Sequence, residues 1–224
     1  MAIIIGLVQV KGGAGRSTIA TNLAGMFSAK YKTALIDCDM PQGTSASWYA
    51  LRQQDERAGN LAIATAKDHI ELVREVDKFN RSQCEVIIID APPRIAEATR
   101  AILILSQLCL VPLGGSAAEI WATADLLKTI EEAKARKPEV DARIVWTRFR
   151  AVTKSAQELS EAVSKELKLK ELHSRLGYRV AYSDALAQGR TVLEWPDMVA
   201  REEMVALGQE VGRILKVKRQ EARK

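Results

Sequence analysis

The stretch Lys11-Gly12-Gly13-Ala14-Gly15-Arg16-Ser17-Thr18 decides the expected fold of this 224-residue chain. It follows the short apolar run 3–8, which is rich in β-branched residues and predicts a buried strand. After it, apolar residues recur at helical spacing over residues 19–27. A glycine-rich loop between a strand and a helix turns backbone N–H groups toward one anion, and the helix adds its positive end. The stretch therefore predicts a phosphate-binding loop, and with it nucleotide binding.

The composition is that of an ordinary globular protein, with 47% hydrophobic and 27% charged residues. We expect one domain over residues 1–224, located in the cytoplasm, since no apolar run approaches the roughly 20 residues that span a bilayer and no signal peptide is evident. Cys38, Cys84 and Cys109 lack metal-site or redox spacing, so we expect buried thiols. His69 and His173 form no catalytic or zinc pattern.

Buried strands alternate with amphipathic helices along the chain. This alternation predicts an α/β fold whose mostly parallel central sheet is flanked by helices on both faces. In one helix, Ile70, Val73, Val76 and Phe79 are the expected core positions. The expected strands are 3–8, 32–39, 61–64, 85–89, 108–113, 142–147 and 178–180. The expected helices are 19–27, one from residue 44 with Thr44 or Ser45 as cap, 68–79, 95–105, 117–136, 155–167 and 197–218.

Acidic residues follow two of these strands. Asp90 ends the most apolar run, and Asp37 and Asp39 end the second strand. The carboxyl ends of parallel strands meet at one edge of a sheet, beside the loop that follows the first strand. An acid there can hold Mg²⁺ next to phosphates, although it can also simply cap a turn. Ser17 stands where a P-loop places its Mg²⁺-binding hydroxyl, and Thr18 can reach the α-phosphate.

The loop resembles that of a known family. The ordinary pattern G-x-x-x-x-G-K-[ST] would need glycine at Val10 and lysine at Arg16. Lys-Gly-Gly-x-Gly-x-Ser-Thr after a first strand instead resembles the deviant Walker A loop of the ParA/MinD ATPases, from which Arg16 departs because lysine is usual there. Asp90-Ala91-Pro92-Pro93 resembles the Walker B motif of that family, and residues 179–192 resemble its late segment.

The resemblance implies a P-loop NTPase of the short ParA type with ATP and Mg²⁺ as ligands. Two catalytic roles follow: Lys11 would reach across a dimer interface to the partner's nucleotide, and Asp39 would orient the attacking water. The family pattern D-x-D-P-Q is interrupted here by Met40 before the proline. Either Trp146 or Arg148 would stack on the base. The implied nucleotide contacts are Lys11, Gly12, Gly13, Ala14, Gly15, Arg16, Ser17, Thr18 and Arg148, and the implied magnesium contacts are Ser17, Asp37 and Asp90.

The C-terminal end is strongly basic in a chain of net charge +5. One interpretation is a solvated helix end, where cations suit the helix dipole. The other is a nonspecific, salt-sensitive DNA surface, as ParA-type relatives use on the nucleoid. The apolar face of this segment is thin and lacks an aromatic anchor, so we expect no membrane contact. The candidate DNA-binding residues are Arg213, Lys216, Lys218 and Arg219.

The expected function is therefore that of a nucleoid-associated ParA-type ATPase. Such a protein forms a homodimer with ATP, binds DNA nonspecifically, and positions a partition complex or a protein body such as a carboxysome. Its hydrolysis would be slow and stimulated by an adaptor of ParB or carboxysome-adaptor type. Two alternatives stay open: a nucleotide-gated switch with very slow turnover because of Arg16, and a MinD-like membrane-associated positioning ATPase.

Overall fold

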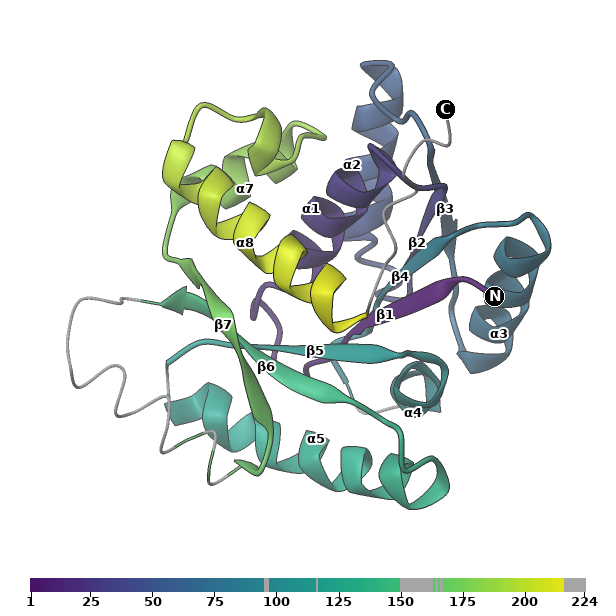
Figure 1. The fold of residues 1–224 in the computed structure, drawn as a ribbon, viewed down its shortest axis with the longest axis vertical. Helices are drawn as coiled ribbons and strands as arrows, with labels where there is room; N and C mark the ends of the chain where they lie inside the picture. The colour runs from purple at the N-terminus through teal and green to yellow at the C-terminus, as the bar shows by residue number, and fades with distance from the viewer. Residues whose placement is uncertain (95–96, 116, 150–162, 164, 166, 216–224) are drawn as a thin grey trace.

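The computed structural model contains a seven-stranded sheet in the order β3-β2-β4-β1-β5-β6-β7 (Figure 1). It describes the chain except for residues 95–96, 116, 150–162, 164, 166 and 216–224. Every strand pairing within the described part is parallel, in agreement with the expected fold class. The strands are β1 (Ile3–Leu7), β2 (Thr33–Asp37), β3 (Leu61–Thr65), β4 (Val86–Asp90), β5 (Leu108–Leu113), β6 (Ala142–Phe149) and β7 (Lys170–Gly177).

Helices cover both faces of the sheet (Figure 1). One face packs against α1 (Arg16–Ser28), α2 (Thr44–Gln54), α7 (Val180–Ala187), the short 3₁₀-helix η1 (Val192–Glu194) and α8 (Met198–Ile214). The other face packs against α3 (His69–Arg81), α4 (Glu97–Leu105) and α5 (Ala117–Arg136). Because strand side chains alternate between faces, each buried strand contributes to two separate cores.

The central strands show this alternation clearly. On β1, Ile4 belongs to the core under α3, α4 and α5, and Ile5 belongs to the core under α1 and α8. Ile87 and Ile88 of the neighbouring strand β4 divide in the same way. All four side chains are buried, which explains why these strands are continuous apolar runs rather than alternating ones.

Three expectations about the elements are wrong. The last strand is β7, whereas residues 178–179 connect β7 to α7 and Val180 begins that helix. Ile70 and Val73 of α3 are about half exposed, because the buried stripe of that helix is formed by Leu72, Val76 and Phe79. The final helix ends at Ile214 within the described chain. Most of the expected helix 155–167 lies outside the described residues.

The sheet register brings the carboxyl ends of β1, β2 and β4 to one level. Leu7 pairs with Asp90, and Asp90 pairs with Asp37 on its other side. The loop between β1 and α1 therefore begins directly beside both carboxylates. In the sheet, β2, β3 and β4 lie on one side of β1, and β5, β6 and β7 lie on the other. Ligands of open parallel sheets usually bind at the carboxyl edge, at the point where the strand order reverses in this way.

We predict opposite stability effects for two glycine-to-alanine changes. A Cβ at Gly6 of β1 would lie 2.5 Å from Ile102 Cγ2 and 2.8 Å from Ser106 Oγ. Gly6→Ala should therefore lower the free energy of unfolding by about 1–3 kcal/mol, since α4 must move. Gly212→Ala on α8 meets no described neighbour within 4 Å and should raise it by about 0.5–1 kcal/mol. Urea unfolding measures both, and a neutral Gly6→Ala would contradict the close approach of α4 to β1.

Candidate functional site

The glycine-rich loop leaves the first turn of α1 open to a ligand. Gly13 and Gly15 have φ values of 74° and 101°, the left-handed region that glycine adopts without strain. Gly15 is the N-cap of α1 and supplies no capping side chain, and the first turn contains no acidic residue. The free N–H groups and the positive helix end therefore face outward from the loop, as a phosphate site requires.

Neighbouring strands hold the loop in this shape. The Thr147 hydroxyl on β6 donates to the carbonyl oxygen of Ala14 at 2.9 Å. The side-chain amide of Gln9 donates to the carbonyl oxygen of Pro112 at 3.0 Å and to Thr123 Oγ1 at 3.1 Å. The loop is thus anchored on β5, β6 and α5, whereas Lys11 is exposed at its tip.

Asp37 and Asp90 are fully buried at the ends of their strands. Both carboxylate oxygens of Asp37 accept backbone N–H groups at 2.9 Å, from Asp39 and from Ala46. The Ser45 hydroxyl donates to Asp90 Oδ2 at 2.8 Å. Neither Thr44 nor Ser45 caps α2 as expected. The N-cap is Gly43. The first turn of the helix instead supplies hydrogen-bond donors to the acids at the strand ends.

Burial raises the pKa of Asp90 to about 6, although the nearby Ser17 and Ser45 hydroxyls favour its charged form. Asp90 Oδ1 has no hydrogen-bond partner among the described residues. Burial also raises the pKa of Asp39, which the charge of Arg16 lowers in part. Carboxylates enclosed in this way are costly unless a cation lies close to them.

Arg16 supplies that cation. Its Nη1 donates to the carbonyl oxygen of Gln9 and, at 3.3 Å, to that of Lys11. Its Nη2 lies 3.6 Å from Asp39 Oδ2, and its Nε lies 4.0 Å from Asp90 Oδ1. Only 6% of the residue is exposed. The guanidinium is therefore directed into the acidic cluster and not toward the open side of the loop, where we expected it to meet phosphate.

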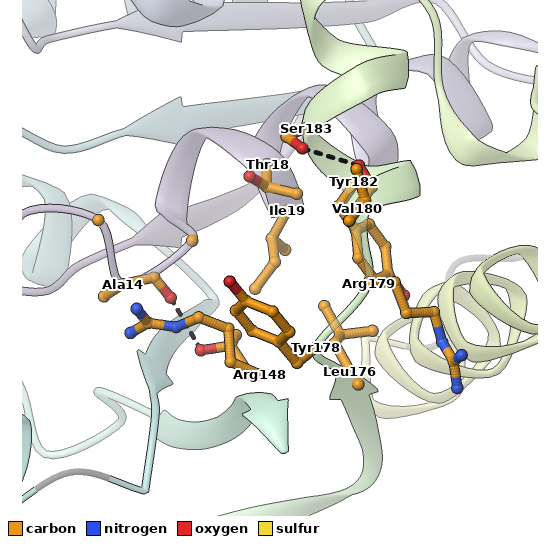
Figure 2. A pocket seen from close by; sticks show the side chains of 14 residues that line it. Ala14, Thr18, Ile19, Arg148, Leu176, Tyr178, Arg179, Val180, Tyr182 and Ser183 are labelled. Carbon is orange, nitrogen blue, oxygen red and sulfur yellow. Dashed lines mark hydrogen bonds between the residues drawn. The ribbon is translucent and has the colours of Figure 1, made fainter. Parts of the chain in front are cut away.

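A pocket of about 270 Å³ lies beside the loop (Figure 2). Its walls come from segments far apart in the sequence: the loop and α1, the end of β6, the end of β7, and α7. Figure 2 shows the Tyr178 ring between Arg148 and Leu176 at the middle of this pocket. The lining residues include Gly13, Ala14, Gly15, Thr18, Ile19, Thr147, Arg148, Leu176, Gly177, Tyr178, Val180 and Tyr182.

The two candidate base-stacking residues differ in position. Arg148 lines the pocket in a left-handed conformation (φ 52°), and its guanidinium forms an ion pair with the buried Glu119 of α5. Trp146 is 1% exposed, and its indole N–H donates to Glu171 Oε2 at 2.6 Å. Trp146 therefore belongs to the core, and Arg148 stays the candidate contact.

Sequence reasoning missed the contribution of β7 and the following turn to this pocket. Leu176, Gly177 and Tyr178 line it, yet only Leu172 and Leu176 are buried apolar side chains on β7. Two leucines among charged residues give no strand pattern that can be separated from a helix. The one available signal was the position of Tyr178 directly before the late segment 179–192 that carries the family resemblance.

Glu203 of α8 holds this newly found wall together. Its carboxylate accepts the backbone N–H of Gly177 at 3.0 Å, the guanidinium of Arg179 at 2.7 Å and the hydroxyl of Tyr182 at 2.9 Å. Burial, together with the charge of Glu203, raises the pKa of Tyr182 well above its ordinary value, so the phenol stays neutral. One carboxylate thus connects the end of β7, α7 and α8.

The candidate magnesium ligands do not form a complete metal site by themselves. Within the described residues, no group of three His, Cys, Asp or Glu side chains is arranged to hold a metal ion by itself. Mg²⁺ beside a nucleotide needs fewer protein ligands, because phosphate oxygens and water complete its shell. Asp90 Oδ1, which accepts no hydrogen bond, and the nearby Ser17 are the groups that could meet that requirement, although Arg16 Nε lies 4.0 Å from the same oxygen.

The basic C-terminal candidates are only partly described. Arg213 lies in the last turn of α8, whereas Lys216, Lys218 and Arg219 lie outside the described residues. None of the helices in the described chain has the length and hydropathy that crossing a membrane requires. Cys38, Cys84 and Cys109 are buried free thiols, as expected.

The fold and the loop define a P-loop α/β protein whose candidate nucleotide site lies at the carboxyl edge of its sheet. Residues 5–192 match the family model described as the CobQ/CobB/MinD/ParA nucleotide binding domain. The chain belongs to this family.

Its relatives include two proteins named "Maintenance of carboxysome distribution protein A". The one from Halothiobacillus neapolitanus is 25% identical over 86% of this chain and 88% of its own length. The one from Gloeobacter kilaueensis is 29% identical over 89% and 88%, respectively. The solved structure of apo McdA from Cyanothece superposes with a TM-score of 0.77 over 95% of this chain and 100% of its own, at 16% identity.

We predict that Glu203→Ala lowers the free energy of unfolding by about 1–3 kcal/mol, since it removes the acceptor of the Gly177 N–H and the Arg179 guanidinium and one of two acceptors of the Tyr182 hydroxyl. Glu203→Gln keeps an acceptor oxygen and should cost less. The matched control is Glu202→Ala, an exposed neighbour on the same helix that should change stability by less than about 0.5 kcal/mol. Equal urea midpoints for Glu203→Ala and Glu202→Ala would refute the role of Glu203.

Proposed function

We propose that this chain is a ParA-type ATPase that binds ATP with Mg²⁺, dimerises, and positions or segregates a cargo through slow, partner-stimulated hydrolysis. One observation carries the proposal. The open first turn of α1, the paired carboxylates of Asp37 and Asp90, and the pocket at the ends of β6 and β7 meet at one edge of the sheet. Phosphoryl transfer depends mainly on positioning and charge stabilisation, and this edge offers both. A solved ATP complex of a Cyanothece McdA variant, with a TM-score of 0.75 at 15% identity, adds support for ATP as the ligand.

Each part of the site has a proposed role in that chemistry. The N–H groups from Gly12 to Thr18 would bind the phosphates, and the pocket at Arg148 would bind the base. Ser17 would hold Mg²⁺, together with Asp90 when Arg16 leaves that carboxylate, and the metal ion neutralises phosphate charge when it is bound. Asp37 has both oxygens engaged by backbone N–H groups, so its part in metal binding would be indirect. Asp39, whose side chain is 13% exposed, would orient the attacking water.

The cargo is proposed from the relatives. Two of them carry names that refer to carboxysome distribution, which supports a protein body as cargo. A DNA partition complex is the other candidate within the same family. The genes that flank this one would discriminate, because a carboxysome-adaptor gene supports the first cargo and a ParB-type gene supports the second.

Lys11 should act between two copies of the chain. It is exposed at the tip of the loop, and its backbone carbonyl accepts a hydrogen bond from Arg16. A cation in this position can stabilise phosphate charge on a partner's nucleotide. We expect a nonhydrolysable ATP analogue with Mg²⁺ to convert wild type from monomer to dimer in light scattering, and Lys11→Ala to stay monomeric.

The exposed Lys67→Ala variant, which lies before α3, serves as the matched control and should dimerise like wild type. A monomeric wild type, or a Lys11→Ala dimer, would exclude the role in trans. ATP in place of the analogue then separates enzyme from switch. A dimer that decays as phosphate appears supports slow turnover, whereas a persistent dimer without phosphate release supports a nucleotide-gated switch.

We also propose that the ATP-bound form binds DNA through the basic end of the chain. The supporting observations are the sequence of residues 213–224 and the position of Arg213 in the last turn of α8. Backbone contacts to DNA would be independent of base sequence. Retention on the nucleoid would follow from such binding.

DNA affinity should require ATP and fall by about tenfold or more over a modest rise in salt, because bound counterions are released. Replacing Lys216, Lys218 and Arg219 by alanine should weaken binding to all DNA sequences alike. The control replaces the exposed residues Lys67, Lys78 and Arg81 by alanine, which removes the same charge. Fluorescence anisotropy with two unrelated duplexes measures the effect. Equal losses in both triple variants would mean that net charge alone matters.

A further inference from the structure

Arg16 occupies the interior of the site, although it is the loop residue that aligns with the phosphate-binding lysine of the ordinary pattern. Its guanidinium is enclosed between the carbonyl oxygens of Gln9 and Lys11 on one side and the acidic residues on the other. At 6% exposure it is as buried as Arg52, which forms a bidentate ion pair with Glu194. The buried position of Arg16 therefore depends on the acidic cluster.

Arg16 approaches oxygens of the acidic cluster that accept no hydrogen bond from a backbone N–H or from Ser45. Asp37 uses both oxygens for backbone N–H groups, and Asp90 Oδ2 accepts the Ser45 hydroxyl. Of the oxygens that accept none of these hydrogen bonds, Asp90 Oδ1 and Asp39 Oδ2 are the two that form ion pairs with Arg16. They lie 4.0 Å from Nε and 3.6 Å from Nη2 of Arg16, respectively.

These distances describe an ion pair without close hydrogen bonds to the acids. Neither Arg16 Nε nor Asp90 Oδ1 has a hydrogen-bond partner within the described chain. The guanidinium thus neutralises the cluster by proximity, while its best hydrogen bonds go to the loop carbonyls.

A divalent metal ion that binds Asp90 directly would compete with this guanidinium for the cluster. Mg²⁺ requires oxygen ligands at about 2.0–2.1 Å in octahedral geometry, and it would need the same Asp90 oxygen that faces Arg16 Nε. Two cations within a few ångströms in a buried site repel strongly. A lysine at this position is compact and flexible enough to leave the acids for the phosphates, whereas arginine is planar and forked, and here it is bound to two carbonyl groups.

We propose that Arg16 competes with the metal ion for the acidic cluster. Because Arg16 holds Asp39 and Asp90, Mg²⁺ adds little to nucleotide affinity in this chain. The inference rests on the nucleotide binding proposed above. When the nucleotide binds, Arg16 stays with Asp39 and Asp90, and the phosphates rely on the N–H groups of the loop. Mg²⁺ gains its contact with Asp90 only in the fraction of molecules whose Arg16 has moved away.

Nucleotide titrations with and without Mg²⁺ test this competition. The dissociation constant of a nonhydrolysable ATP analogue is measured by calorimetry in excess Mg²⁺ and in EDTA. For wild type we expect a change of less than about threefold, and for Arg16→Lys at least tenfold tighter binding with Mg²⁺, about 1.4 kcal/mol. Arg52→Lys, a buried arginine outside the site, is the matched control and should respond to Mg²⁺ as wild type does.

A second measurement needs only wild type, in case Arg16→Lys folds poorly. Mn²⁺ replaces Mg²⁺, and electron paramagnetic resonance gives its affinity for the protein–analogue complex. The proposal expects this affinity to equal that of the free analogue within about threefold.

The possible outcomes separate the two proposals. Tenfold tighter nucleotide or Mn²⁺ binding in the wild-type complex would overturn the competition by Arg16 while leaving nucleotide binding intact. Absence of analogue binding in wild type and Arg16→Lys, under both conditions, would overturn the proposed function itself.

Discussion

The structure is constrained by the placement of three carboxyl groups at one end of a parallel sheet. The register of β2 and β4 brings Asp37 and Asp90 side by side, and the sheet is covered on both faces, so water cannot solvate them. Each oxygen therefore needs a donor or a cation from the protein. The first turn of α2, the Ser45 hydroxyl and the Arg16 guanidinium meet that need, and in doing so they fix where the loop and both helices begin.

The same constraint separates what can be predicted from the sequence. β1, β4 and the loop between β1 and α1 depend on local patterns: continuous β-branched runs and glycines that adopt left-handed angles. The acids Asp37 and Asp90 follow from the rule that parallel strands end at one edge. These parts of the site can therefore be located from residue patterns alone, and their positions in the fold agree with that expectation.

The parts that were missed depend on long-range contacts. β7 has few apolar residues, and it is a strand because β6 and α8 hold it in place. Glu203 contacts three groups that are 21 to 26 residues away in sequence, a relation that no spacing rule contains. The direction of the Arg16 side chain could not be predicted for the same reason. The side chain can face the phosphate position or the acids, and only the assembled site decides between the two.

The buried guanidinium also has a consequence for how such chains are classified. Substitution tables score arginine and lysine as near equivalents, so this position would contribute almost nothing to the distance between two aligned sequences. Here Arg16 contacts the backbone carbonyl groups of Gln9 and Lys11 and two acidic side chains. A compact ammonium group could not make all of these contacts in the same way. Homologues that carry either cation can therefore share a fold and a motif while differing in the resting charge distribution of their sites. Dividing the family by the residue aligned with Arg16 would group its members by the charge distribution of their sites. Overall sequence identity does not report that property.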